Sequence, residues 1–195
     1  GAGPAGIEAA VTAASAGAEV ALIDSSPRPG GQYYKQIPDS FSVDDKTGHF
    51  IHGQKLLQKL ASSRVRVYQN TLVWGVFEAS IPGMYCLTLH GPDAPDRLNA
   101  KAVIIANGAF DCSIPFPGWD LPGVMTTGAA LTMIKNQRVI PGKRVILTGT
   151  GPLQLAAAAN LALAGAEVVG VLESAKNLVG RAIPYLPALW GQWDR

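Results

Sequence analysis

Gly1-Ala2-Gly3-Pro4-Ala5-Gly6 is the stretch of the chain that decides its fold. Its glycines are spaced as in the G-x-G-x-x-G turn that joins a strand to a helix in dinucleotide-binding units. Gly1 permits the tight turn, Gly3 lets a pyrophosphate approach the backbone, and Gly6 lets the helix pack on its strand. Pro4 suits the first helical turn, where its missing N–H costs nothing. We expect the turn positions Gly1, Gly3, Pro4, Ala5 and Gly6 to bind a diphosphate through helix-terminal amides.

The opening recurs in the second half of the chain. The string GAGPAGIEAAVTAASAGAEVALIDSS from Gly1 returns as GTGPLQLAAAANLALAGAEVVGVLES from Gly149. Each copy contains a glycine turn, an alanine-rich helix, the string A-G-A-E-V, an apolar strand at 20–23 or 168–172, and then a carboxylate. Gly17 is expected to end the first helix, because glycine adopts the left-handed C-cap conformation without penalty. The repeat predicts a β-turn-α-β unit that occurs twice.

The carboxylate that ends each copy is a candidate ligand for a ribose. Asp24 lies at the spacing of about 20 residues expected for a ribose-binding acid. An ordinary glycine turn without a cofactor is the alternative interpretation of the first copy. In the second copy Gly149 and Gly151 are present, but Gln154 stands at the position of the third glycine. Glu173 could hold a ribose diol there, which favours NAD over NADP. Binding of NAD(H) and a retained fold that holds another nucleotide or none both stay open.

The rest of the chain indicates mixed α/β structure. A helix is expected at residues 52–62, with Leu56, Leu57 and Leu60 on one face, and another at 127–136. Strands are expected at 65–78, 84–90 and 102–106, the last buried and ending on a glycine turn, and at 144–147. Because a glycine turn needs a strand leading into it, we expect a fragment that lacks this first strand and a closing segment after Arg195.

Composition narrows the class of protein. Apolar residues make up 48% of the chain and charged residues 15%, which favours a packed core over disorder. The net charge is +2 with scattered basic residues, so nucleic-acid binding is not expected. No apolar run approaches a membrane span and no signal peptide is recognised, so we expect a cytoplasmic protein that a partner could still hold at a membrane. The three histidines have no metal-ligand spacing, and no metal site is expected.

Ser25-Ser26-Pro27-Arg28-Pro29-Gly30-Gly31-Gln32 follows Asp24 directly. Here the chain resembles the FAD domains of the two-dinucleotide-domain flavoprotein superfamily, the group containing glutathione and thioredoxin reductases. The resemblance implies that Arg28 lies near the adenosine and that Gly31 and Gln32 run toward the ribityl and ring end. It also implies an adenine contact at Val73.

A second stretch, Ala106-Asn107-Gly108, stands where the superfamily has A-T-G. Asn107 departs from that triplet, whereas Ala106 and Gly108 keep the small residues that allow close backbone approach. The superfamily's disulfide reductases carry C-x-x-C or C-x4-C beside the flavin, and neither spacing occurs around Cys86 or Cys112. We therefore expect two free thiols and no redox-active disulfide.

The strings at 27–34 (PRPGGQYY), 115–129 (PFPGWDLPGVMTTGA) and 141–155 (PGKRVILTGTGPLQL) resemble one subgroup more closely. This subgroup contains the hydrogen cyanide synthase B subunit, the opine oxidase A subunit and the dye-linked proline dehydrogenase alpha subunit. The likeness implies an electron-transferring FAD subunit beside a second flavoprotein subunit, with an amine, amino acid or opine as substrate. A stand-alone NAD(P)H-dependent flavoprotein reductase and a non-catalytic nucleotide-binding scaffold are the alternatives.

The expected fold class is α/β, with two nested Rossmann-like (FAD/NAD(P)-binding) domains, parallel sheets and an antiparallel β-meander. The flavin domain is expected at 1–112, and a second, inserted nucleotide-binding domain at 113–195. No residue in this sequence is identified as a catalytic acid, base or nucleophile.

Overall fold

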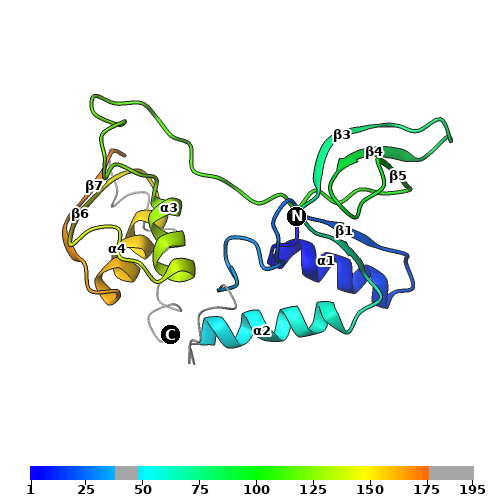
Figure 1. Ribbon diagram of the computed structural model, residues 1–195, viewed down its shortest axis with the longest axis horizontal. Helices are drawn as coiled ribbons and strands as arrows, with labels where there is room; N and C mark the ends of the chain where they lie inside the picture. The colour runs from blue at the N-terminus through cyan, green and yellow to red at the C-terminus, as the bar shows by residue number, and fades with distance from the viewer. Residues whose placement is uncertain (38–47, 176–195) are drawn as a thin grey trace. The chain divides into compact units, whose positions relative to one another are not determined.

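The computed structural model of the chain describes residues 1–37 and 48–175 (Figure 1). The chain divides into two compact units, Gly1–Phe110 with Lys135–Gln137, and Asp111–Ile134 with Arg138–Arg195. That these units are nested flavin and nucleotide domains, as expected for 1–112 and 113–195, stays a prediction.

The first unit begins with the predicted turn, helix and strand. Helix α1 spans Pro4–Ser15 and is followed by strand β1, Ala21–Ile23. Gly17 has φ +92°, and its N–H donates to the Ala14 carbonyl at 3.0 Å, so the predicted glycine C-cap is confirmed. Strand β1 pairs in parallel with β2, Arg66–Tyr68, in the register Ala21 to Arg66.

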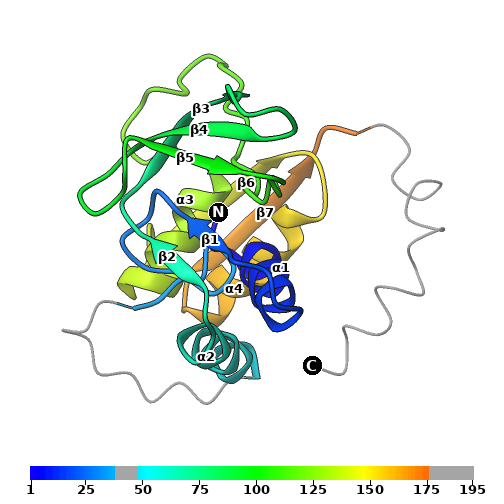
Figure 2. The same ribbon diagram turned by 90° about the vertical axis from the view of Figure 1, so that its right-hand side faces the viewer.

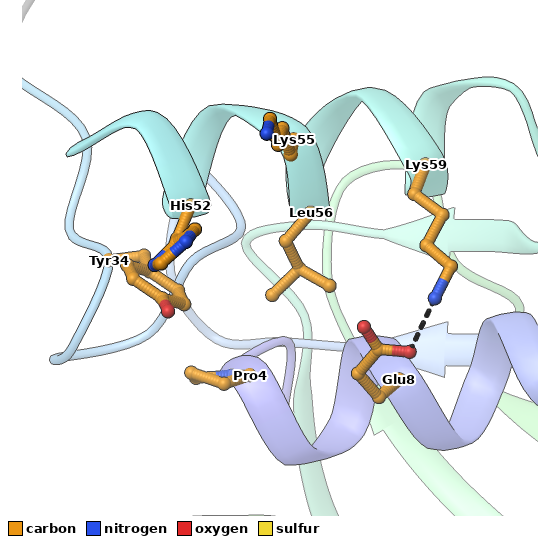
Figure 3. Close-up of a pocket in the computed structure, with 7 residues that line it drawn as sticks. All are labelled: Pro4, Glu8, Tyr34, His52, Lys55, Leu56 and Lys59. Atoms are coloured by element: carbon orange, nitrogen blue, oxygen red, sulfur yellow. Dashed lines mark hydrogen bonds and ion pairs between the residues drawn. The ribbon is translucent and has the colours of Figure 1, made fainter. Parts of the chain in front are cut away.

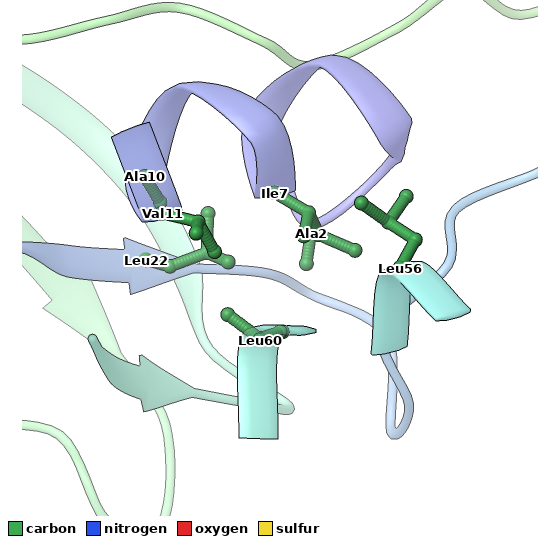
Figure 4. Close-up of a cluster of buried hydrophobic side chains, with 7 residues drawn as sticks. All are labelled: Ala2, Ile7, Ala10, Val11, Leu22, Leu56 and Leu60. Carbon is green, nitrogen blue, oxygen red and sulfur yellow. The ribbon is translucent and has the colours of Figure 1, made fainter. Parts of the chain in front are cut away.

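Helix α2, Gly48–Ala61, covers the same core as α1. It begins four residues before the predicted helix, and its leucine face is confirmed, because Leu56 and Leu60 are buried and Leu57 is partly buried. The buried cluster joins the glycine turn, both helices and β1, as Figure 4 shows. It consists of Ala2, Ile7, Ala10, Val11, Leu22, Leu56 and Leu60. Small side chains on α1 let the helix lie close to its neighbours, so the turn is anchored in the core through Ala2.

An antiparallel meander completes the first unit. Its strands are β3, Leu72–Glu78, β4, Tyr85–His90, and β5, Arg97–Ala100, in the order β3-β4-β5 (Figure 2). The predicted run 65–78 is two strands, β2 and β3, because Asn70 between them has φ +49° and turns the chain. Strand β5 was not predicted, since Arg-Leu-Asn-Ala has little of the β-branched and aromatic character typical of strands.

The prediction of a buried strand at 102–106 is wrong. The structure assigns no regular element there, and Ile104 and Ile105 are 68% and 80% exposed. A strand is held by hydrogen bonds to a neighbouring strand, and none of the strands in the described ranges pairs with this run. Its apolar character therefore leads to no sheet in this structure.

The second unit contains the second copy of the repeat. Strand β6, Arg144–Gly149, leads into helix α4, Leu153–Leu163, and then into β7, Glu167–Glu173. Strands β6 and β7 pair in parallel, and Leu147, Ala157, Leu161 and Ala166 form their core. Gly165, with φ +97°, ends α4 as Gly17 ends α1.

The helix predicted at 127–136 is present with an irregular end. Helix α3 spans Thr127–Thr132, capped by the Thr126 hydroxyl, which accepts from the Ala129 N–H at 3.2 Å. A π-helical turn, Met133–Gln137, continues it and ends at Arg138 in the left-handed conformation. The α/β class with parallel and antiparallel sheets is confirmed. Among the described residues, no helix combines the length and apolarity needed to cross a bilayer.

Candidate functional site

The first glycine turn is built from close contacts between backbones. A Cβ on Gly1 would overlap the carbonyl oxygen of Ala106, and a Cβ on Gly6 would overlap the carbonyl oxygen of Gly1. No side chain fits at either position without moving main-chain atoms. The folded turn itself therefore requires Gly1 and Gly6, as expected from their roles in the tight turn and the helix contact.

Gly3 differs from these two glycines. Its backbone, φ −75° and ψ 179°, is open to any residue, and the nearest atom to an added Cβ is the Gly31 Cα at 3.9 Å. The fold thus has no need of glycine at this position. A glycine that the fold does not require is explained if another molecule approaches the backbone there.

The helix that follows presents donors beside Gly3. Gly3 is the N-cap of α1 and Pro4 its first residue, as predicted. The N-cap offers no side-chain hydrogen bond, and within the described residues none is donated by the main-chain N–H of Gly3, Ala5 or Gly6. Because these amides point along the helix axis and add to the positive end of its dipole, they suit an anionic group.

Asp24 lies at the carboxyl end of β1 and is bound to the turn. Its Oδ2 accepts from the Ala2 N–H, and its Oδ1 accepts from the Ser26 N–H at 2.7 Å. Its own backbone bridges β2 and the start of β3, since its N–H donates to Tyr68 and its carbonyl accepts from Thr71, both at 2.9 Å. An ionised carboxylate has about four acceptor sites, so two remain for a ribose diol.

The loop after Asp24 lies against the turn. The Gly30 N–H donates to the Ala2 carbonyl at 2.7 Å, and Gly31, with φ +62°, comes so close to Gly3 that a Cβ on it would lie 2.7 Å from the Gly3 Cα. Arg28 donates from Nη1 to the Ile37 carbonyl at 3.1 Å and so ties the loop together. Gln32 is exposed.

The structure therefore brings most of the predicted first-site residues together. The turn that contains Gly1, Gly3 and Gly6 contacts Asp24 through the Ala2 N–H. Gly31 lies against Gly3, and Ala106 packs against Gly1. Val73 lies two residues after Thr71, whose N–H is bonded to Asp24. Gly108, with φ +71°, has no atom within 4 Å of an added Cβ and makes no such contact. The ligand roles assigned to all of these residues stay predictions.

Sequence reasoning missed two residues that hold this arrangement. Ala2, fully buried, donates to Asp24 and accepts from Gly30, and the variable position of a G-x-G motif gives no signal for that role. Thr71 is 1% exposed, and its hydroxyl donates to the Gln69 carbonyl at 2.8 Å. A polar residue at the start of an apolar strand was the available signal.

The second glycine motif differs from the first in its backbone angles and hydrogen bonds. Gly149 and Gly151 have φ values of +148° and +104°. Glu173 accepts at Oε2 from the Gly151 N–H at 3.0 Å and at Oε1 from the Ala175 N–H at 2.9 Å. The pKa of Glu173 is lowered, first by the Ala175 amide, then by the Thr150 hydroxyl and the Gly151 amide. Gln154 is 4% exposed and donates from Nε2 to Glu173 at 3.5 Å.

A cavity of about 370 Å³ lies between α1 and α2 (Figure 3). Its polar lining includes His52 and Lys55 from α2, and the ion pair between Lys59 Nζ and Glu8 Oε2, 2.8 Å apart. Both partners of this pair are about half exposed, where such pairs stabilise by about 0–1 kcal/mol. Glu8 is the only carboxylate among the described residues that line the cavity, and it is already paired with Lys59, so these residues do not form a metal-ligand cluster.

In the described ranges, the structure brings together neither a cluster of metal ligands nor a pair of cysteines. No group of three or more His, Cys, Asp or Glu side chains there could hold a metal ion. Cys86 is partly buried and Cys112 exposed, and both are free thiols.

Comparison with known proteins agrees with the resemblance found in the sequence. Residues 1–185 match the family described as pyridine nucleotide-disulphide oxidoreductase. The chain is 36% identical over 196 aligned residues to the opine oxidase A subunit of Agrobacterium tumefaciens, covering 96% of this chain and 38% of that protein. It is 30% identical to hydrogen cyanide synthase subunit HcnB of Pseudomonas protegens, covering 89% and 37%.

Among solved structures, L-proline dehydrogenase from P. horikoshii matches with a TM-score of 0.68 and 26% identity, covering 88% of this chain and 34% of that one. The chain thus spans somewhat more than a third of the length of the curated relatives named above.

Proposed function

Since the chain belongs to the pyridine nucleotide-disulphide oxidoreductase family, we propose that its first glycine turn binds FAD and that the protein is an FAD-dependent oxidoreductase. The observation that carries this proposal is Gly3. The fold leaves open space above its backbone, and the neighbouring amides of the first turn of α1 have no partner within the described residues.

The residues around the turn fit the adenine-dinucleotide part of FAD. The diphosphate would be held by the N–H groups of Gly3, Ala5 and Gly6 at the positive end of α1. Asp24, with acceptor sites to spare, would hold the adenosine ribose, and the backbone near Val73 the adenine. A carboxylate fixed from two sides by Ala2 and Ser26 is oriented before any ligand arrives.

The remaining predicted contacts concern the edges of the cofactor. Gly31 and Gln32 would run beside the ribityl chain, Arg28 beside the adenosine, and Ala106 and Gly108 would give backbone contacts. FAD supplies the redox chemistry in such proteins, since it accepts a hydride and releases electrons. The chain positions the cofactor, and its hydrogen bonds tune it; we assign no residue of it as acid, base or nucleophile.

The named relatives favour a subunit over an independent enzyme. The opine oxidase and hydrogen cyanide synthase relatives are each one subunit of a larger enzyme by name. We propose that this protein transfers electrons beside a second flavoprotein subunit, which oxidises an amine, amino acid or opine. A cytoplasmic location is part of the same proposal.

The proposal is tested on the full-length protein, expressed with and without the product of a neighbouring flavoprotein gene. We expect a yellow protein whose cofactor, released by heat, is identified as FAD by chromatography. We expect substrate oxidation only when both subunits are present. Rapid bleaching of the flavin by NADH in the isolated protein would instead support a stand-alone reductase. A colourless protein that takes up no FAD would leave only a nucleotide-binding scaffold.

A further inference from the structure

The two glycine motifs of the repeat differ at the residue that packs the helix on its turn. In the first motif this residue is Gly6, whose backbone touches that of Gly1 so closely that no Cβ fits. In the second it is Gln154, whose side chain is 4% exposed and extends to the first glycine of its turn. A Cβ on Gly149 would lie 3.6 Å from the Gln154 Nε2. A side chain therefore fills the space that main-chain atoms occupy in the first motif.

The turn and the start of the helix that follows it also differ between the two motifs. Helix α1 begins at Pro4 after an extended N-cap, whereas α4 begins at Leu153, one position later in the motif. Pro152, the N-cap of α4, already has helical angles, φ −70° and ψ −18°. The backbone of the turn itself also differs, since Gly151 has φ +104° where its counterpart Gly3 has φ −75°.

The acid of the second motif also binds a different amide. Asp24 accepts from Ala2, the residue between the two glycines, and leaves the Gly3 N–H unused. Glu173 accepts from Gly151 itself, at 3.0 Å, and is held in that position by the Ala175 N–H at 2.9 Å, with the Gln154 Nε2 3.5 Å away. Gly151 is the counterpart of Gly3, so a carboxylate occupies the donor that a diphosphate would need.

The side-chain oxygen of Gln154 is a further unusual feature of the second motif. This atom, Oε1, is buried and accepts no hydrogen bond from the described residues. A buried carbonyl without a donor destabilises a fold, so stability alone does not account for glutamine at this position. The amide nitrogen of the same side chain, Nε2, contacts the Glu173 carboxylate, and we attribute the glutamine to that contact.

We propose that Gln154 and Glu173 close the second glycine turn to the diphosphate of NAD(H), so that Gln154 is a specificity-determining residue. The second motif then keeps the β-turn-α-β fold but not the dinucleotide. Two anions cannot share the Gly151 N–H, and like charges repel each other at short range. This inference does not depend on FAD at the first motif.

The direction in which one substitution changes the affinity for NAD⁺ distinguishes this proposal from a ribose-binding role for Glu173. Glu173→Gln keeps an acceptor oxygen and removes the charge. If Glu173 excludes the diphosphate, the variant binds NAD⁺ more tightly than the wild type. If Glu173 binds the ribose diol, the variant binds NAD⁺ more weakly, as expected for loss of a charged acceptor.

The experiment is a calorimetric titration of the full-length protein with NAD⁺, which does not reduce a flavin. We expect no saturable binding by the wild type up to about 1 mM, a concentration that detects even weak ligands. We expect Glu173→Gln and Gln154→Gly to bind NAD⁺ with dissociation constants of about 0.1 mM or below, at least about tenfold tighter than the wild-type limit. The first variant removes the competing charge, and the second removes the side chain that fills the turn. Gln154→Ala, which keeps helix propensity, replaces Gln154→Gly if that variant does not fold.

Several outcomes would overturn the proposal. These are micromolar binding of NAD⁺ by the wild type, weaker binding by Glu173→Gln, or no binding by the Glu173→Gln, Gln154→Gly double variant while it remains folded. Folding is followed by circular dichroism, and flavin content by absorbance in the same samples. A protein without flavin would contradict the proposed function, yet its NAD⁺ titration would still test the second motif.

Discussion

Replacement of Gly3 by alanine tests the cofactor site apart from the fold. The added Cβ meets only the Gly31 Cα, at 3.9 Å, and the backbone angles of Gly3 are ordinary for alanine. Alanine is a poorer N-cap than glycine, but it also lowers the entropy of the unfolded chain. Because these effects oppose each other, we expect the free energy of unfolding of the apoprotein to change by less than about 1 kcal/mol.

The effect on FAD binding should be much larger. A methyl group above Gly3 holds the diphosphate away from the amides of Gly3 and the first turn of α1. Hydrogen bonds between amides and a charged group are worth about 1.5–3 kcal/mol each. Loss of two at the lower value is about 3 kcal/mol, which weakens FAD binding by about a hundredfold.

The assay reconstitutes the apoprotein with FAD and follows flavin fluorescence, and urea unfolding of the apoprotein is measured in parallel. Gly170→Ala is the matched control, because Gly170 in β7 likewise has an ordinary backbone and space for an added Cβ, with no atom within 4 Å of it. We expect this control to bind FAD as the wild type does. If Gly3→Ala bound FAD with unchanged affinity, the diphosphate would not lie over Gly3 and the reasoning would be refuted.

Four other substitutions follow from the same contacts. Gly6→Ala should destabilise the protein by about 2 kcal/mol or more in urea unfolding, because its Cβ overlaps the Gly1 carbonyl; unchanged stability would contradict the turn geometry. Asp24→Asn should weaken FAD binding by about tenfold in the fluorescence assay, since one charged acceptor is lost. Leu60→Ala should cost about 2–5 kcal/mol in urea unfolding, as Leu60 is buried between α1 and α2. Glu173 has a lowered pKa in the folded chain, so its contribution is present at neutral pH and lost as pH falls through that pKa; the difference in Tm between wild type and Glu173→Gln should therefore shrink on acidification.

Local chemistry made the repeated β-turn-α-β unit predictable from the sequence. Gly17 and Gly165 end their helices with positive φ, as glycine after an alanine-rich run indicates. The leucine face of α2 was predictable for the same reason, since a spacing of three and four residues places Leu56, Leu57 and Leu60 on one side.

Features that depend on distant partners were not predictable in this way. The run 102–106 is as apolar as a buried strand. Whether a strand forms depends on hydrogen bonds to a neighbouring strand, which the composition of the run does not specify. Strand β5 is the converse case: a polar segment becomes a strand because β4 lies beside it, with Leu98 opposite Leu87. Within the site, Glu173 follows the first glycine of its motif by 24 residues, one more than Asp24, which follows Gly1 by 23. Each acid accepts from the amide 22 residues before it, so Glu173 binds Gly151 where Asp24 binds Ala2.

The hydrogen bond from Gly30 to the carbonyl of Ala2 has a consequence for the thermodynamics of loading. The loop and the turn are already joined in the apoprotein, so a ligand entering there meets a rigid receptor and orders little chain as it binds. Loading should then be limited by removal of water from the exposed amides, with a small entropic penalty from the polypeptide. Rigidity of this kind favours slow release of the ligand once it is bound.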